Sequence, residues 1–135
     1  MPRPICPLVG AGLLLLLGGC ATSGPAYGPP PAGAAAVVDM TNTFSFRPEL
    51  VRIPVGGTVV WRNRSLVSHT VTIDPAKVRD RGAVSLPRGA QPFDSGSIPR
   101  GQIWPRTFVV PGTYRYVCLP HYDVFGMVGT VLVGP

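Results

Sequence analysis

Glycine and proline interrupt the chain every few residues after position 37, and this spacing limits the fold more than any other feature. The sequence contains 17 of each. The runs between them are short, alternate between apolar and polar residues, and never keep a helical period for long. Alternation is typical of β-strands, because strand side chains point in turn to the two faces of a sheet. We therefore expect residues 37–135 to fold as one all-β domain.

Eight runs have the length and alternation of strands. They are residues 37–46, 50–53, 58–61, 69–73, 93–98, 103–110, 114–118 and 127–133. Seven or eight short strands with frequent turns predict a Greek-key antiparallel β-sandwich of about a hundred residues. An immunoglobulin-like sandwich fits the same pattern, although this chain lacks the cysteine pair that often joins the two sheets of such domains.

The stretch between residues 74 and 92 differs from the rest of the domain. Asp74-Pro75 has the pattern of a helix cap followed by proline, and Gly82 is suited to close a helix of one or two turns. The stretch also carries four basic residues, which are Lys77, Arg79, Arg81 and Arg88. We expect a solvated excursion on the sandwich surface, with contact to a partner as the alternative.

The first 36 residues lack the pattern of a packed core. A basic start at Arg3 is followed by an apolar run that ends in small residues at Gly18-Gly19-Cys20, which is the order of an export signal. The run is too short for a membrane-spanning helix, which needs roughly 20 apolar residues. A buried N-terminal helix is the alternative interpretation.

The segment Leu17-Gly18-Gly19-Cys20 resembles the bacterial lipobox, in which the cysteine is lipidated and becomes the first residue of the mature protein. The residues that follow are almost wholly Ala, Gly, Pro and Ser, the composition of an extended tether. We therefore expect a lipoprotein signal peptide at 1–19, a lipidated Cys20 with its tether at 20–36, and the exported domain at 37–135.

Cysteine usage and charge narrow the possible functions. Cys6 leaves with the signal and Cys20 carries lipid, so Cys118 has no disulfide partner and is either a functional thiol or an inert buried one. The formal charge is +6, and loss of Arg3 leaves 11 basic against 6 acidic residues. This excess of basic residues favours binding to an acidic partner surface or to anionic lipid. We expect no nucleic-acid binding, because no basic run is interleaved with aromatic residues.

Four side chains in the domain have metal-binding chemistry. Cys118 and His121 form a Cys-x-x-His pair, Met127 follows closely, and His69 is the only other histidine. Two imidazoles, one thiolate and a weak axial thioether are the set with which proteins hold a one-electron copper centre. The thiolate favours Cu(I), the neutral imidazoles accept both oxidation states, and the thioether tunes the potential. These four residues are our candidate ligands of one type 1 copper ion.

With these residues in view, the domain from about 40 to 133 resembles the cupredoxins, specifically the plastocyanin, pseudoazurin and amicyanin group of small blue copper proteins. The resemblance rests on the segments 61–71, 93–96, 111–116 and 118–127. It implies a cupredoxin-like sandwich and single-electron transfer between redox partners, without enzymatic activity. It also implies docking through the apolar residues around His121, which are Leu119, Pro120, Tyr122, Val124 and Phe125, with ordinary loop packing as the alternative.

One departure from this pattern concerns the axial position. Five residues separate His121 from Met127, whereas plastocyanin-like loops usually have four or fewer. A bulge would absorb the extra residue and leave Met127 as the axial ligand. Alternatively, the axial position is long, vacant or taken by an oxygen donor such as Asp123, and Met127 is a core residue that opens a strand.

We expect a monomeric electron carrier, lipid-anchored on the periplasmic or extracellular side of a bacterial membrane. Its partners would be redox proteins, such as a cytochrome or a copper or haem enzyme, with an acidic docking surface. Two histidines cannot build the further copper sites of multicopper oxidases or nitrite reductases. The alternative is an extracytoplasmic protein for copper storage or delivery. A third class comprises a cysteine enzyme and an adhesion sandwich with an inert thiol. A cysteine enzyme that uses Cys118 and His121 would need a residue to orient the histidine, and Asp123 is the one candidate in the sequence.

Overall fold

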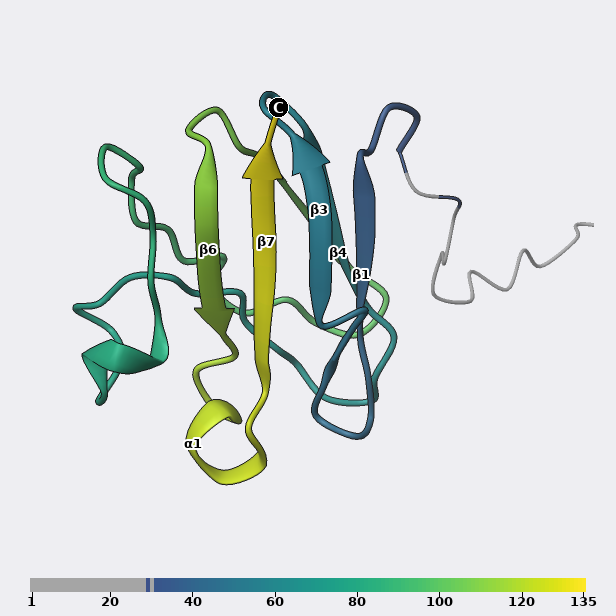
Figure 1. Cartoon of the computed structure of the whole chain (residues 1–135). Helices are drawn as coiled ribbons and strands as arrows, with labels where there is room; N and C mark the ends of the chain where they lie inside the picture. The colour runs from purple at the N-terminus through teal and green to yellow at the C-terminus, as the bar shows by residue number, and fades with distance from the viewer. Residues whose placement is uncertain (1–28, 30) are drawn as a thin grey trace, which may run out of the picture.

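The computed structural model describes residue 29 and residues 31–135. The predicted signal peptide, Cys20 and most of the predicted tether lie outside these residues. Within the described residues, a pair of β-sheets packs face to face (Figure 1). No helix among them has the length and apolar character that crossing a membrane requires.

Seven strands form the two sheets. Their bounds are Ala36–Met40 (β1), Phe46–Arg47 (β2), Leu50–Pro54 (β3), Thr58–Asn63 (β4), Ile103–Thr107 (β5), Gly112–Val117 (β6) and Val128–Gly134 (β7). The strand order is β2-β1-β4-β5 in one sheet and β3-β7-β6 in the other. The predicted β-sandwich is confirmed.

The sheets are mixed and not antiparallel throughout. Strand β1 runs parallel to β4, and β3 runs parallel to β7, whereas the other three pairs are antiparallel. Parallel neighbours need a long connection between them. Here the chain makes this connection by forming a strand of the opposite sheet before it returns to the first sheet. The alternation of residues within single strands does not show which strands pair, so it did not predict these parallel pairs.

Two of the eight predicted strands are absent, namely 69–73 and 93–98. These segments make only isolated bridges, such as His69 with Ile98 and Thr72 with Asp94. A side chain takes the place of a ladder bond between them, because the Val71 N–H donates to Ser95 Oγ at 2.8 Å. Local side-chain acceptors compete with strand pairing in this way.

The helix predicted near residues 74–82 is wrong. Asp74 and Asp80 instead close short turns, in which their carboxylates accept hydrogen bonds from the backbone of Ala76 at 2.9 Å and Gly82 at 2.8 Å. Only a 3-10 helix, η1, follows at Arg81–Ala83. An α-helix that we did not predict, α1, spans Tyr122–Phe125 and ends at Gly126, whose φ of 67° is left-handed.

Aromatic side chains fill the centre of the sandwich. The rings of Trp61 and Tyr116 lie edge to face at 5.3 Å, and Phe46 packs on Tyr116 at 4.8 Å. Tyr116 lies so close to β7 that a Cβ at Gly129 would overlap its ring and hydroxyl oxygen. These ring contacts join the two sheets, because Trp61 and Phe46 belong to one sheet and Tyr116 to the other.

Candidate metal centre

The helix α1 lies at one end of the sandwich (Figure 1). Three donor side chains from the segments next to it and after β4 meet in one cluster. His69 lies in the segment after β4, Cys118 directly follows β6, and His121 directly precedes α1. Their donor atoms all lie within 4.8 Å of one another. The structure therefore brings together three of the four predicted ligands from two distant parts of the chain.

The three donor atoms form a nearly regular triangle. The Cys118 sulfur lies 3.2 Å from Nδ1 of His121 and 3.6 Å from Nδ1 of His69, and the two nitrogens are 3.2 Å apart. A point equidistant from all three is about 2 Å from each, near the ~2.0–2.3 Å at which proteins hold comparable ions through nitrogen and sulfur. The residues therefore fit one copper ion.

Burial sets the protonation of these groups. His69 and Cys118 are fully buried, whereas His121 is partly exposed. Burial, followed by the proximity of His121, lowers the pKa of His69 to about 4, and burial lowers the pKa of His121. Burial also raises the pKa of the Cys118 thiol. At pH 7 both imidazoles are neutral and free to coordinate, and a metal that binds must displace the thiol proton.

A buried serine orients the imidazole of His69. Ser65 Oγ lies 2.8 Å from Nε2 of His69, and also close to two acceptors, Asn63 Oδ1 at 2.8 Å and the Val67 carbonyl at 2.7 Å. We assign the single hydroxyl proton to one of these acceptors, which makes Nε2 of His69 the donor to Ser65. This tautomer leaves the lone pair on Nδ1, which faces Cys118.

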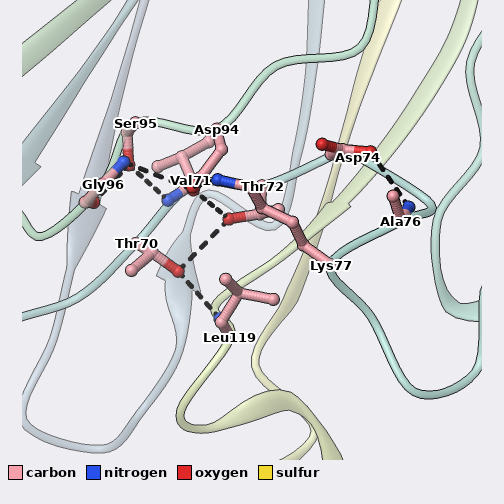
Figure 2. Close-up of polar contacts among 10 residues, drawn as sticks. All are labelled: Thr70, Val71, Thr72, Asp74, Ala76, Lys77, Asp94, Ser95, Gly96 and Leu119. Carbon is pink, nitrogen blue, oxygen red and sulfur yellow. Dashed lines mark hydrogen bonds and ion pairs between the residues drawn. The ribbon is translucent and has the colours of Figure 1, made fainter.

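Thr70 ties the segment of His69 to the segment of Cys118. Its backbone N–H points at the Cys118 sulfur at 3.4 Å, and its hydroxyl accepts a hydrogen bond from the backbone N–H of Leu119 at 2.8 Å (Figure 2). A donor on the sulfur favours the thiolate over the thiol. The same residue thus positions the predicted sulfur ligand and partly offsets the effect of burial on the pKa of its thiol.

A polar network extends from Thr70 to the protein surface. The hydroxyl of Thr72 lies 3.4 Å from that of Thr70 and donates to Asp94 Oδ1 at 2.7 Å (Figure 2). Asp94 Oδ2 accepts from Lys77 Nζ at 2.6 Å. The segment 93–96 therefore supports the segment of His69.

Sequence reasoning missed the supporting roles of Ser65, Thr70 and Asp94. Small polar residues close to a candidate histidine are a weak signal for Ser65 and Thr70. Asp94 is separated from His69 by a long loop and has no such signal. Only the packed structure shows which of these side chains are buried and what they contact.

Met127 directly precedes β7 and is fully buried. Its carbonyl accepts a hydrogen bond from the N–H of Cys118 at 3.0 Å, so the two residues are neighbours across the loop. Four of the five residues between His121 and Met127 form α1, and the β6–β7 register runs to Val117 and Val128 without a β-bulge. The other predicted donor, Asp123, is not in the triangle, and its carboxylate lies 3.2 Å from the guanidinium of Arg79.

Comparison with known sequences agrees with this geometry. Residues 33–134 match the family described as copper binding proteins, plastocyanin/azurin family. The amicyanin of Paracoccus denitrificans is 34% identical over 97 residues, which cover 72% of this chain and 66% of the amicyanin. The chain thus spans slightly less than two thirds of that relative.

Solved structures show the same likeness. A Cu(I) form of an amicyanin variant has a TM-score of 0.60 at 27% identity, over 82% of this chain and 89% of that chain. A copper-containing nitrite reductase from Thermus scotoductus SA-01 has a TM-score of 0.55 at 25% identity, over 74% of this chain and 22% of that chain. The likeness to the reductase concerns only a small part of a longer protein.

Proposed function

The chain belongs to the plastocyanin/azurin family of copper-binding proteins, and on this premise we propose that it carries single electrons between redox partners. A copper ion in the triangle would supply a one-electron Cu(I)/Cu(II) couple. The observation that carries the proposal is the convergence of one sulfur and two imidazole nitrogens at 3.2–3.6 Å. We assign His69, Cys118 and His121 as equatorial ligands and Met127 as the axial ligand.

The arrangement of the donors favours electron transfer over copper storage or delivery. His69 and Cys118 are fully buried and held by Ser65 and Thr70, so the site is assembled before any metal binds. Only His121 reaches the surface. A metal enclosed in this way is released slowly, whereas an electron needs only a short path through the exposed imidazole. With two histidines in the whole chain, we propose no enzymatic activity.

Exposed apolar side chains in the segments that carry His121 and His69 support docking of a protein partner at this end. Val124 is 72% and Phe125 55% exposed on α1, and Leu66 is 68% and Val67 44% exposed in the segment before His69. Of the residues predicted to dock, Leu119 and Tyr122 are partly buried against the core. We propose that a redox protein with an acidic surface binds this end of a monomer, in keeping with the basic charge and the small area available.

We further propose that the chain is exported and held to a membrane by lipid on Cys20. The position of β1 supports this, because its first residue lies at the end of the sandwich opposite α1 (Figure 1). A tether that enters there leaves the donor triangle free for partners. In a bacterial host, the full chain should appear in the membrane fraction and its Cys20→Ala variant in the soluble exported fraction. Identical fractionation would refute the anchor.

A visible spectrum tests the proposed function. The apo protein is titrated with Cu(II), reduced and reoxidised. We expect one equivalent of copper to produce an intense band that bleaches on reduction and returns on oxidation. Copper binding without such a band, or rapid transfer of the metal to a chelator, would favour storage or delivery. Absence of copper binding would refute both functions.

The axial assignment has its own test in the variant Met127→Leu. Leucine keeps the volume but has no sulfur, so the band should persist while the reduction potential changes. Unchanged spectrum and potential would show that Met127 is a core residue and not a ligand.

A further inference from the structure

The two imidazoles of the centre are held in different ways. Nε2 of His69 donates to Ser65 at 2.8 Å, whereas Nε2 of His121 makes no hydrogen bond to any described residue. The backbone of His121 is fixed, since its N–H donates to the Cys118 carbonyl at 3.0 Å and its carbonyl accepts from the Phe125 N–H at 2.9 Å. These bonds leave rotation of the imidazole about its side-chain torsions unrestrained.

An aromatic ring from the turn between β1 and β2 lies against that imidazole. The ring of Phe44 is 4.6 Å from the ring of His121, and it stacks on Phe125 at 4.2 Å with an interplanar angle of 15°. Phe125 itself lies farther from His121, at 6.0 Å. Phe44 is therefore the aromatic residue in closest contact with His121, and its ring is itself packed against Phe125 of α1.

The turn that carries Phe44 is strained. Its φ of 53° is the only positive value at a non-glycine residue in the described part of the chain. A side chain in the left-handed region costs free energy, and such strain persists only where the surroundings impose it. Here the Phe44 N–H donates to the Thr41 carbonyl at 3.2 Å, and the hydroxyls of Thr41, Thr43 and Ser45 lie 2.8–3.1 Å from one another.

Strain at this position has a consequence for the metal centre. Glycine would adopt the same backbone without cost, but it would place no ring on His121. The turn between β1 and β2 thus keeps a costly conformation that delivers an aromatic ring to the one donor that lacks a hydrogen-bonded support.

We propose that Phe44 is a positioning residue of the metal centre, whose ring holds the imidazole of His121 with Nδ1 toward Cys118 and thereby slows the release of copper. The inference rests on the proposed function for the identity of the metal. His121 is the most exposed of the three donor residues, so opening of the site begins there. Phe44 orients the imidazole of His121 through a ring contact, as Ser65 orients the imidazole of His69 through a hydrogen bond.

The test compares Phe44→Leu with Phe44→Tyr. The copper-loaded proteins are mixed with excess chelator, and the decay of the visible band gives the rate of copper release. An aromatic contact of this kind accounts for a change of about threefold to tenfold. We therefore expect Phe44→Leu to release copper faster by that factor, and Phe44→Tyr, which keeps the ring, to stay close to the original rate.

Two controls separate positioning from general loss of stability. Val133→Ala removes core volume in β7 near the end opposite the centre and should lower the unfolding temperature without a faster release. Val109→Ala removes an exposed apolar side chain from the turn that follows β5, outside the proposed site, and it should also leave the rate unchanged. The proposal is overturned if Phe44→Leu releases copper at the original rate, or if Val133→Ala accelerates release as much.

A measurement on the apo protein keeps the proposal testable without copper. The ring of Phe44 should shift the proton resonances of the His121 ring in the NMR spectrum, and Phe44→Leu should remove this shift. If the unmodified protein binds no copper, the proposed function fails, but this spectrum still shows whether Phe44 orients His121. Unchanged His121 resonances in Phe44→Leu would overturn the positioning role.

Discussion

The two ends of the sandwich are held together by different kinds of bond. At the end opposite α1, turns at residues 54–57 and 108–112 join consecutive strands of the two sheets. Backbone groups close them, as where Gly56 N–H donates to the Phe108 carbonyl at 2.7 Å, with one side-chain bond from the Tyr114 hydroxyl to the Val110 carbonyl at 2.7 Å. At the end with α1, the segments 41–45, 64–72 and 118–127 meet through side chains, including Thr70 on the Leu119 N–H and Phe44 on His121. The first end depends mainly on backbone conformation, and the second depends on specific functional groups.

This difference predicts which property each end controls. Substitutions at the backbone-built end should lower the free energy of unfolding and leave the metal centre unchanged. Substitutions at the side-chain-built end should alter metal binding more than folding. Four substitutions and two matched controls test this division.

The largest effect on the centre is expected from Cys118→Ser. Removal of the sulfur should abolish the intense visible band and lower copper affinity by more than about a hundredfold, since loss of a supporting residue alone costs about 10- to 100-fold. Serine is slightly smaller than cysteine, so circular dichroism should show the same β-sheet content. A band of the original intensity would exclude Cys118 as a ligand.

The largest effect on folding is expected from Gly112→Ala at the opposite end. The φ of Gly112 is 136°, and an added Cβ would lie 2.7 Å from Cβ of Pro87. Strain and overpacking together should lower the free energy of unfolding by about 2–3 kcal/mol, measured by urea denaturation of the apo protein.

Gly56→Ala is the matched control for Gly112→Ala. Its φ of 82° is also left-handed, but nothing lies within 4 Å of the added Cβ. It should cost only about 1 kcal/mol. Both variants should keep the visible band of the copper-loaded protein. A band altered by either variant would show that the two ends are coupled.

Ser65→Ala should weaken copper binding with a modest effect on folding. Without the Ser65 hydroxyl, Nε2 of His69 loses its acceptor at 2.8 Å and the imidazole loses its fixed tautomer. We expect affinity to fall by about tenfold, measured by competition with a chelator. Ser68→Ala, in the exposed part of the same loop, should bind copper as tightly as the original protein. Equal affinities of all three proteins would remove Ser65 from the support of the centre.

The smallest effect is expected from Asp94→Asn, and it depends on pH. Burial raises the pKa of Asp94, but the hydrogen bonds from Lys77, Thr72 and Gly96 outweigh burial and leave the pKa below its ordinary value of 3.8. A carboxyl whose pKa is lower in the folded state stabilises the fold above its unfolded pKa, and this contribution is lost as pH falls through the folded pKa. The original protein should therefore melt a few degrees above Asp94→Asn near pH 6, and this difference should shrink below about pH 4. A gap that is constant with pH would show that the carboxylate charge plays no part.

The sequence was most informative where the structure depends on neighbours in the chain. Alternation along residues 50–53, 58–61 and 114–118 predicted β3, β4 and β6 within a few residues, because strand geometry alternates side chains whatever the partner strand is. The chemistry of one thiol, two imidazoles and a thioether likewise predicted the donor set from residue types alone. The strands predicted at 69–73 and 93–98 were wrong. Alternation is present in both segments, but a side-chain hydrogen bond replaces part of the strand pairing between them.

What the sequence determined by itself is a β-sandwich with a soft, copper-binding set of donors, because alternation and ligand chemistry are properties of individual residues and their immediate neighbours. The tertiary structure decided the parallel pairing of β1 with β4 and of β3 with β7, the one-turn helix α1, and the supports of the two imidazoles. Ser65 and Phe44 have no special chemistry of their own. They matter because folding brings them to 2.8 Å from Nε2 of His69 and 4.6 Å from the ring of His121, and contacts between distant segments depend on packing that no local pattern records.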